Sequence, residues 1–170
     1  QTILMTARCE VDVIHDRHDT LFGGRMPSPN SASLESLKRY VVDNGCALGI
    51  ATDGDADRLG VIDDKGNFLY PNQMRVILYY YLLKYRGRRG PVARNVATTS
   101  LLDDVAHRFG QECHEVPVGF TWVSGKMLET DAIIGGESSG SLTVRGTSPA
   151  RTGSTPRPCS WRCWPWSANP

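Results

Sequence analysis

The sequence predicts an α/β protein with two consecutive α/β/α units, mixed and largely parallel sheets, and an irregular tail. Three observations support this fold class. Short apolar runs alternate with segments of helical periodicity through most of the chain. Turns that contain glycine, asparagine or proline separate these segments. After Gly146 the apolar periodicity stops, so the 170 residues hold two small units and a tail rather than one large domain.

The first unit is expected to contain one helix and several short strands. Alternating or apolar runs predict the strands, whereas leucine and valine at helical spacing predict the helix, which Asn44 and Gly45 end. In chain order we expect a strand at 9–14, a helix at 34–41, and strands at 47–51, 59–62 and 68–70.

The second unit is expected to alternate strand and helix more regularly. A long helix comes first, with one apolar stripe formed by Met74, Ile77, Leu78, Tyr81, Leu82 and Tyr85. Gly90 and Pro91 end it. The elements that follow are a strand at 92–97, a helix at 101–109, a strand at 112–116, a helix at 121–128 and a strand at 132–135.

Composition excludes several classes of function. The formal net charge of +1 and the 40% apolar content give no electrostatic reason to expect a nucleic-acid or membrane partner. No apolar run reaches the roughly 20 residues that cross a bilayer, and no secretory signal is apparent. The five cysteines form no metal-ligand pattern, so we expect a reducing, cytoplasmic setting. The missing initiator methionine suggests that the chain begins inside a longer protein.

The most informative segment is an acidic loop at residues 53–58, between two predicted strands. Asp53, Asp55 and Asp57 occupy alternate positions, and Gly54 allows a tight bend that lets them converge. Carboxylates crowded in this way predict a hard divalent cation such as Mg²⁺. Arg58 adds planar donors suited to a phosphate oxygen. Together these groups indicate phosphoryl transfer.

The acidic loop is also compatible with three other classes of protein. An EF-hand also alternates aspartates, but Arg58 stands where its glycine is needed and the flanks are β-like. A haloacid-dehalogenase-like phosphatase would use Asp53 as a nucleophile, which leaves Asp57 and Arg58 unexplained. A third alternative is a non-catalytic remnant that binds Mg²⁺ or a phosphosugar.

Four segments, in order and at the expected spacing, resemble the α-D-phosphohexomutases, the phosphoglucomutase/phosphomannomutase family. Thr52 to Arg58 resembles the metal-binding loop of that family, and Gly135-Gly-Glu-Ser-Ser-Gly140 resembles its sugar-recognition loop. Phe22 to Asn30 is similar to the segment before a helix in its second domain, and Val116 to Phe120 to a loop of its third. The resemblance covers nearly all of residues 1–146.

The resemblance implies an isomerase of carbohydrate metabolism that interconverts hexose 1-phosphates and 6-phosphates. Residues 1–72 would be a shortened domain 2 and residues 73–146 domain 3. It implies Mg²⁺ on Asp53, Asp55 and Asp57, a catalytic Arg58, and a phosphosugar bound by the sugar-recognition loop. The expected substrate-binding residues are Glu137, Ser139 and Gly119.

The departures from the family are equally informative. The sequence contains no Ser-His loop of mutase domain 1 and no domain 4, so we expect little turnover from this fragment alone. The tail at 147–170 is rich in Pro, Ser, Thr and Arg and carries three of the four tryptophans. Codons compatible with Thr147 to Ser154, re-read in another frame, give His-Ile-Pro-x-Lys-Asp-Gly-Ile, which the family would place next. We therefore interpret the tail as either disordered or frameshifted.

Overall fold

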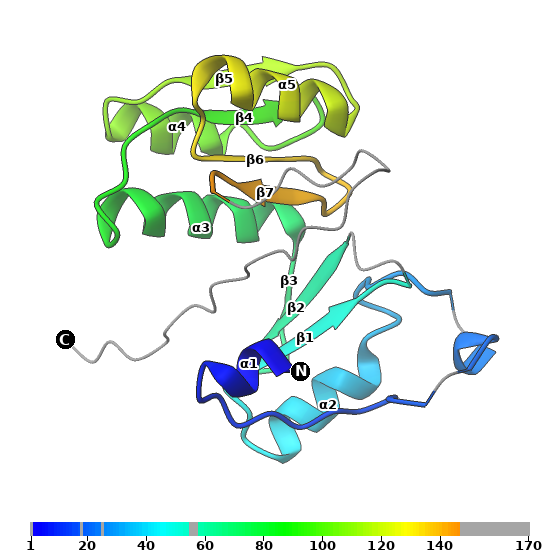
Figure 1. The fold of residues 1–170 in the computed structure, drawn as a ribbon. Coiled ribbons are helices and arrows are strands. Elements are labelled where there is room, and N and C mark those ends of the chain that lie inside the picture. Colours follow the sequence, from blue (N-terminus) through cyan, green and yellow to red (C-terminus); the bar gives the residue numbers. More distant parts are fainter. Residues whose placement is uncertain (1, 18, 25, 55–57, 147–170) are drawn as a thin grey trace.

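A computed structural model of the chain describes residues 2–17, 19–24, 26–54 and 58–146, which form two α/β units one after the other (Figure 1). Both parallel and antiparallel strand pairs occur, which confirms the predicted mixed α/β class. The tail at 147–170 lies outside the described residues. No helix in the described ranges is long and apolar enough to cross a membrane.

The first unit is built on a three-stranded sheet of order β1-β2-β3, and both strand pairs are antiparallel. The described residues of this unit therefore form no largely parallel sheet of the kind that we predicted. Because Thr52 pairs with Leu59, the acidic loop is the connection of the β1-β2 hairpin. The elements are α1 (Thr2–Thr6), a short 3-10 helix η1 (Phe22–Gly24), α2 (Glu35–Asp43), β1 (Leu48–Thr52), β2 (Leu59–Asp63) and β3 (Phe68–Leu69).

Helix α2 covers one face of this sheet. A Cβ on Gly49 of β1 would lie 2.7 Å from Cγ2 of Val41 and 3.1 Å from Cγ of Leu37, both on α2. The glycine therefore lets helix and strand approach more closely than a larger residue would allow. Asn44, as predicted, follows the last helical residue, and Gly45 after it has a φ of 63°.

The predicted strand at 9–14 is wrong, because these residues form no ladder in the structure. Among the described residues, β1 pairs only with β2, and the 9–14 segment lies near α2 instead. The ring nitrogen Nε2 of His15 is 3.2 Å from Oγ of Ser36 on α2. The negative charge of Asp12 raises the pKa of Tyr40, also on α2. Alternating residues form a strand only where a neighbouring strand takes up their backbone hydrogen bonds.

The second unit contains a four-stranded sheet of order β5-β4-β6-β7. Strand β4 runs parallel to both β5 and β6, and β7, which we had not predicted, is antiparallel to β6. The elements are α3 (Pro71–Lys84), β4 (Val92–Asn95), α4 (Leu101–Arg108), β5 (Cys113–Val116), α5 (Phe120–Thr130), β6 (Ile134–Gly136) and β7 (Leu142–Val144).

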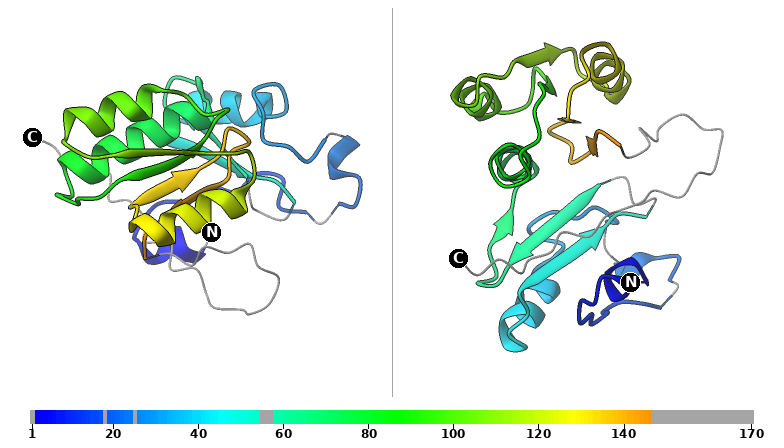
Figure 2. Two further views of the ribbon diagram at one scale, coloured as in Figure 1. Left: turned by 90° about the horizontal axis from the view of Figure 1, so that it is seen from above. Right: turned by 60° about the vertical axis from the view of Figure 1, so that its left-hand side comes forward.

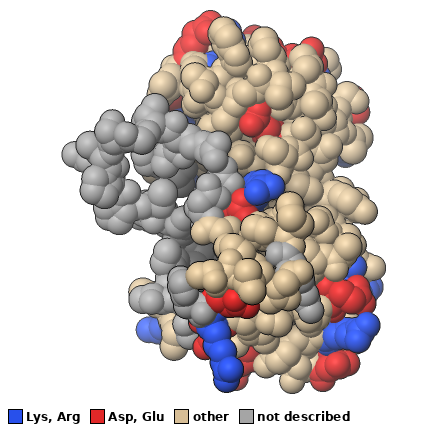
Figure 3. Space-filling view, turned by 90° about the vertical axis from the view of Figure 1, so that its right-hand side faces the viewer, with Lys and Arg blue, Asp and Glu red and all other residues tan. Residues whose placement is uncertain are grey.

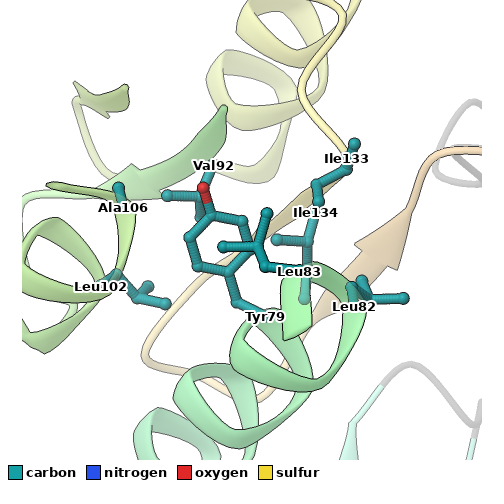
Figure 4. Close-up of a cluster of buried hydrophobic side chains, with 8 residues drawn as sticks. All are labelled: Tyr79, Leu82, Leu83, Val92, Leu102, Ala106, Ile133 and Ile134. Atoms are coloured by element: carbon teal, nitrogen blue, oxygen red, sulfur yellow. The ribbon is translucent and has the colours of Figure 1, made fainter. Parts of the chain in front are cut away.

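Helices cover both faces of this second sheet, with α3 and α4 on one face and α5 on the other (Figure 2). The core beneath α3 and α4 surrounds Tyr79, whose ring points from α3 toward α4 and β4 (Figure 4). Its hydroxyl donates a hydrogen bond of 3.2 Å to the carbonyl of Gly90. This bond satisfies the one polar atom of a side chain that is otherwise fully buried.

The apolar stripe predicted for α3 is only partly right. The side chains that α3 buries are those of Arg75, Tyr79, Leu82 and Leu83, whereas Ile77 and Tyr85 are at least half exposed. The side chains of α3 itself are apolar around nearly its whole circumference, so their periodicity does not indicate which face is buried. Packing against α4 and the sheet selects it instead.

Charged side chains on one side of the molecule do not form a patch of one sign. Figure 3 shows Lys and Arg interspersed with Asp and Glu over the first unit, and fewer charges over the second. The described part of this face therefore provides no continuous basic surface.

The close contact between α2 and β1 yields a stability prediction. Gly49→Ala should lower the free energy of unfolding by about 1–3 kcal/mol, because the new methyl group overlaps Val41. Gly125→Ala, in the middle of α5, is the matched control, since apart from the adjoining backbone of the helix nothing lies within 4 Å of the added Cβ. That change should raise stability by about 0.5–1 kcal/mol. Urea unfolding of both variants measures the difference, and equal effects would contradict the packing argument.

Candidate functional site

The two ends of the acidic loop are fastened to each other. The backbone N–H of Arg58 donates to Oδ1 of Asp53 at 3.1 Å, and its side-chain Nε donates to Oδ2 at 2.6 Å. The Asp53 side chain is 1% exposed and that of Arg58 42% exposed. A buried carboxylate therefore holds an arginine whose guanidinium reaches the surface, and the arginine compensates the buried charge.

The described residues test the predicted metal site only in part. Asp55 and Asp57 lie outside them, and no group of three acidic, histidine or cysteine side chains elsewhere in the described ranges could hold a metal ion. Asp53 contributes a hard oxygen donor at the end of β1, which suits Mg²⁺. Three carboxylates on one hairpin loop fit such an ion by donor chemistry.

The segment that precedes α2 lies against the acidic loop. Nη1 of Arg58 is 3.4 Å from Oγ of Ser28, and a Cβ on Gly54 would lie 3.6 Å from the Phe22 ring. The side chain of Asn30 accepts bonds from the backbone N–H groups of Ala32 and Ser33, which shapes the turn into α2. The proline- and asparagine-containing segment, Phe22 to Asn30, thus packs against both ends of the acidic loop.

The glycine loop, residues 135–140, begins within β6 and continues beyond the last residue of that strand, Gly136. A Cβ on Gly135 would overlap Met127 and Val123 of α5, and one on Gly136 would lie 2.8 Å from Cδ of Arg75 on α3. The two glycines thus allow helices to approach the strand closely from opposite faces. This close packing places the next residue, Glu137, at the carboxyl end of the parallel strands.

The Glu137 carboxylate accepts hydrogen bonds from two other segments of the second unit. Its Oε1 accepts a bond of 2.7 Å from the backbone N–H of Gly119 and one of 3.1 Å from Nδ2 of Asn95. The hydroxyl of Thr98 donates to Oδ1 of Asn95 at 2.7 Å. All three side chains, Glu137, Asn95 and Thr98, are buried. The carboxylate therefore ties the end of β4 and the start of α5 to the glycine loop.

The remaining predicted sugar contacts lie beside Glu137. Gly119 has a φ of 132°, which disfavours any residue with a Cβ, and it immediately precedes α5. Ser139 is exposed on the glycine loop. The loop closes through a bond of 3.0 Å from the N–H of Gly140 to the carbonyl of Glu137. A fixed carboxylate next to an exposed hydroxyl can exchange hydrogen bonds with a polyol.

Arg75 places a buried positive charge beneath the glycine loop. Its side chain bonds the carbonyl of Pro71 and the amide oxygen of Asn72, whereas Nη1 is buried without a hydrogen-bond partner in the described residues. Burial lowers the pKa of its guanidinium to about 10, and the negative charge of Glu137 opposes that shift. Arg75 is therefore charged at neutral pH and electrostatically coupled to Glu137.

The acidic and glycine loops meet at one point. A Cβ on Gly140 would lie 3.7 Å from Cβ of Arg58 and 3.7 Å from Cγ of Pro71, at the start of α3. The structure thus brings Asp53 and Arg58 next to the loop that carries Glu137 and Ser139. Asn95, Thr98 and Arg75 were not predicted as site residues from the sequence. The position of Asn95 and Thr98 at the end of a predicted parallel strand was the available signal.

This arrangement of two α/β units agrees with comparisons to known proteins. Residues 1–66 match the family model for phosphoglucomutase/phosphomannomutase, alpha/beta/alpha domain II, and residues 70–156 match that for domain III. The chain therefore belongs to the phosphoglucomutase/phosphomannomutase family. The domain III match extends past Gly146 into the tail.

Individual relatives agree with the family. A protein named "Probable phosphoglucosamine mutase" from Methanosarcina barkeri is 39% identical over 82% of this chain and 31% of its own length. A phosphoglucomutase/phosphomannomutase from Thermococcus kodakarensis is 33% identical over 82% of this chain and 30% of its own. A crystal structure of a phosphoglucomutase/phosphomannomutase family protein from Burkholderia thailandensis is similar, with a TM-score of 0.74, 27% identity, and 85% and 32% of the two chains covered. The chain spans about a third of the length of these relatives.

The Asp53–Arg58 pair can be tested through stability. Arg58→Met should lower the free energy of unfolding by about 1–2 kcal/mol, because a buried carboxylate loses a charged donor that is itself partly exposed. The control is Arg39→Met on α2, where an exposed arginine lies 3.7 Å from Glu35. That change should cost less than about 0.5 kcal/mol. Equal costs in thermal and urea unfolding would mean that the loop pair is not the anchor described above.

Proposed function

We propose that this chain supplies the metal-binding and sugar-recognising parts of an Mg²⁺-dependent phosphohexomutase. Such an enzyme, an isomerase, moves a phosphoryl group between the 1- and 6-positions of a hexose. The observation that carries the proposal is the contact between the two loops, where Gly140 lies against Arg58. A phosphate at the acidic loop and a sugar ring at the glycine loop would then belong to one ligand.

At the acidic loop, Asp53, Asp55 and Asp57 would hold the Mg²⁺ ion. When bound, the ion withdraws charge from the phosphoryl group that is being transferred. Arg58 would contact phosphoryl oxygens through its exposed guanidinium edge. The bond of 2.6 Å between Nε and Asp53 fixes the direction of that edge. Asp53 would thus serve both the metal and the arginine.

At the glycine loop, Glu137 would accept hydrogen bonds from sugar hydroxyls, and the hydroxyl of Ser139 would exchange them with a neighbouring position on the ring. Gly119 would bring the backbone close to the ligand, since it has no side chain and its φ of 132° disfavours any residue with a Cβ. Hydroxyls are donors, and a buried carboxylate is a strong acceptor for them. We propose a phosphosugar substrate on this chemistry.

The alternatives have less support. Both oxygens of Asp53 accept hydrogen bonds from Arg58, which weakens this carboxylate as the nucleophile of a haloacid-dehalogenase-like phosphatase. Strands, rather than helices, flank the acidic loop, which is unlike an EF-hand. A non-catalytic remnant that binds Mg²⁺ or a phosphosugar uses the same residues and differs only in turnover.

Magnesium binding tests the acidic loop. The chain should bind Mg²⁺ in calorimetry, and Asp55→Asn should weaken that binding at least about tenfold, because one charged ligand is lost. Asp64→Asn is the control, since Asp64 is an exposed acid on the β2-β3 turn. Unchanged affinity in the Asp55 variant would refute the assigned metal site.

Ligand binding and turnover should separate in this fragment. Glucose 6-phosphate should bind the 170-residue chain, whereas a coupled assay should detect no conversion to glucose 1-phosphate. The reason is that this sequence contains no Ser-His loop, whose serine would carry the phosphoryl group in the first domain of a family member. Glu137→Gln should weaken binding about tenfold through loss of the charged acceptor.

The control for that variant is Glu129→Gln, where an exposed carboxylate on α5 pairs with Lys126 at 2.8 Å. It should bind glucose 6-phosphate like the wild type. Robust interconversion of the two phosphates by the purified chain would overturn the claim that it requires further domains.

A further inference from the structure

Two buried hydrogen bonds connect the end of β4 to the carboxylate of Glu137. The residues at that end of β4 have no part in the proposed reaction. Thr98 donates to Asn95 at 2.7 Å, and Asn95 donates to Oε1 of Glu137 at 3.1 Å. Asn95 is 1% exposed and Thr98 6% exposed. Neither side chain is accessible to a ligand, so any role must act through Glu137.

We propose that Asn95 and Thr98 are positioning residues for sugar recognition. Their hydrogen bonds fix the orientation of the Glu137 carboxylate, so that Oε1 is bonded within the protein and Oε2 is directed toward a sugar hydroxyl. This inference rests on the proposed function. The hydroxyl of Thr98 fixes the orientation of the Asn95 amide, because it occupies the amide oxygen and leaves the amide nitrogen for Glu137. The N–H of Gly119 supplies the second donor to Oε1.

Both protein donors bond the same carboxylate oxygen of Glu137, Oε1. Among the described residues, Oε2 of Glu137 receives no hydrogen bond, and it is not one of the buried atoms that lack a partner. It therefore remains able to accept a bond from a ligand. One donor to Oε1 is a buried amide that Thr98 orients and the other is a backbone N–H, so we expect the Glu137 side chain to need little reorganisation when the ligand arrives.

The relay, by which we mean the hydrogen bonds from Thr98 to Asn95 and from Asn95 to Glu137, has three ionisable side chains near it. Arg75 of α3 is the cation coupled to Glu137. Arg94 of β4 bonds the carbonyl of Asn95 and pairs with Asp103 of α4 and Glu115 of β5. Burial raises the pKa of the Cys113 thiol on β5 to about 12, so it stays neutral. Near neutral pH the carboxylate thus faces an amide and a fixed cation.

The test is Asn95→Asp, which replaces a donor by a second carboxylate at the same place. Two carboxylates about 3 Å apart share a proton, and one pKa of the pair rises. At pH 5.5 the shared proton should restore the bond to Glu137, and glucose 6-phosphate affinity should be within about threefold of wild type. At pH 8 both groups ionise and repel, and affinity should be at least about tenfold weaker.

The control is Asn67→Asp, an amide that donates to Asp63 at 2.9 Å on the exposed β2-β3 turn. Affinities are compared as ratios to wild type at each pH, because the phosphate of the ligand itself titrates near pH 6. The ratio for the Asn67 variant should stay constant. A constant ratio for the Asn95 variant as well would overturn the proposal, since a merely structural role gives no dependence on pH.

The amide proton of Gly119, followed by NMR without ligand, should titrate at higher pH in the Asn95→Asp variant than in wild type. If wild type binds no glucose 6-phosphate, the proposed function fails, while that titration still reports whether the relay exists. Should the Asp variant not fold, Thr98→Val removes only the hydroxyl and should weaken binding about three- to tenfold. Unchanged affinity there would refute the role of Thr98.

Discussion

One carboxylate oxygen, Oε1 of Glu137, joins three segments that are far apart in the sequence. It accepts bonds from Asn95 at the end of β4 and from Gly119 at the start of α5, while Glu137 itself follows β6. The carboxyl ends of parallel strands meet at one edge of a sheet, where ligands bind in open α/β folds. The buried bonds hold this edge in a single arrangement because leaving any of these groups unpaired would be costly.

The start of α3 links this edge of the sheet to the first unit. Pro71 and Arg75 contact the glycine loop from below, and Gly140 in turn lies against Arg58. The chain passes from β3 into α3 with Tyr70 alone between them, so the connection between the units is itself part of the site. The residues proposed for phosphate and sugar are therefore adjacent through short covalent and packing links. A chain that spans about a third of the length of its relatives thus contains both loops, and they lie side by side.

Local pattern predicted most of the second unit because each strand and helix there carries its own periodicity and its own turn residues. The failures occurred where a neighbour decides the outcome. Residues 9–14 alternate as a strand does but have no paired strand, and they lie near α2 instead. The buried face of α3 includes Arg75, because the helix is apolar almost all round and its partners choose the face. The roles of Asp55 and Asp57 remain predictions from donor chemistry.

The sequence by itself determined the alternation of elements, the two strands that flank the acidic loop, and the family, because these depend on residue types at short spacing. It also singled out Glu137 and Arg58 as chemistry-bearing residues. Only the tertiary structure decided that Asp53 holds Arg58, that Asn95 and Thr98 stand behind Glu137, and that Arg75 lies beneath it. These contacts join residues from separate strands and helices. Their partners are set by which chain segments pack together, and no local pattern encodes that choice.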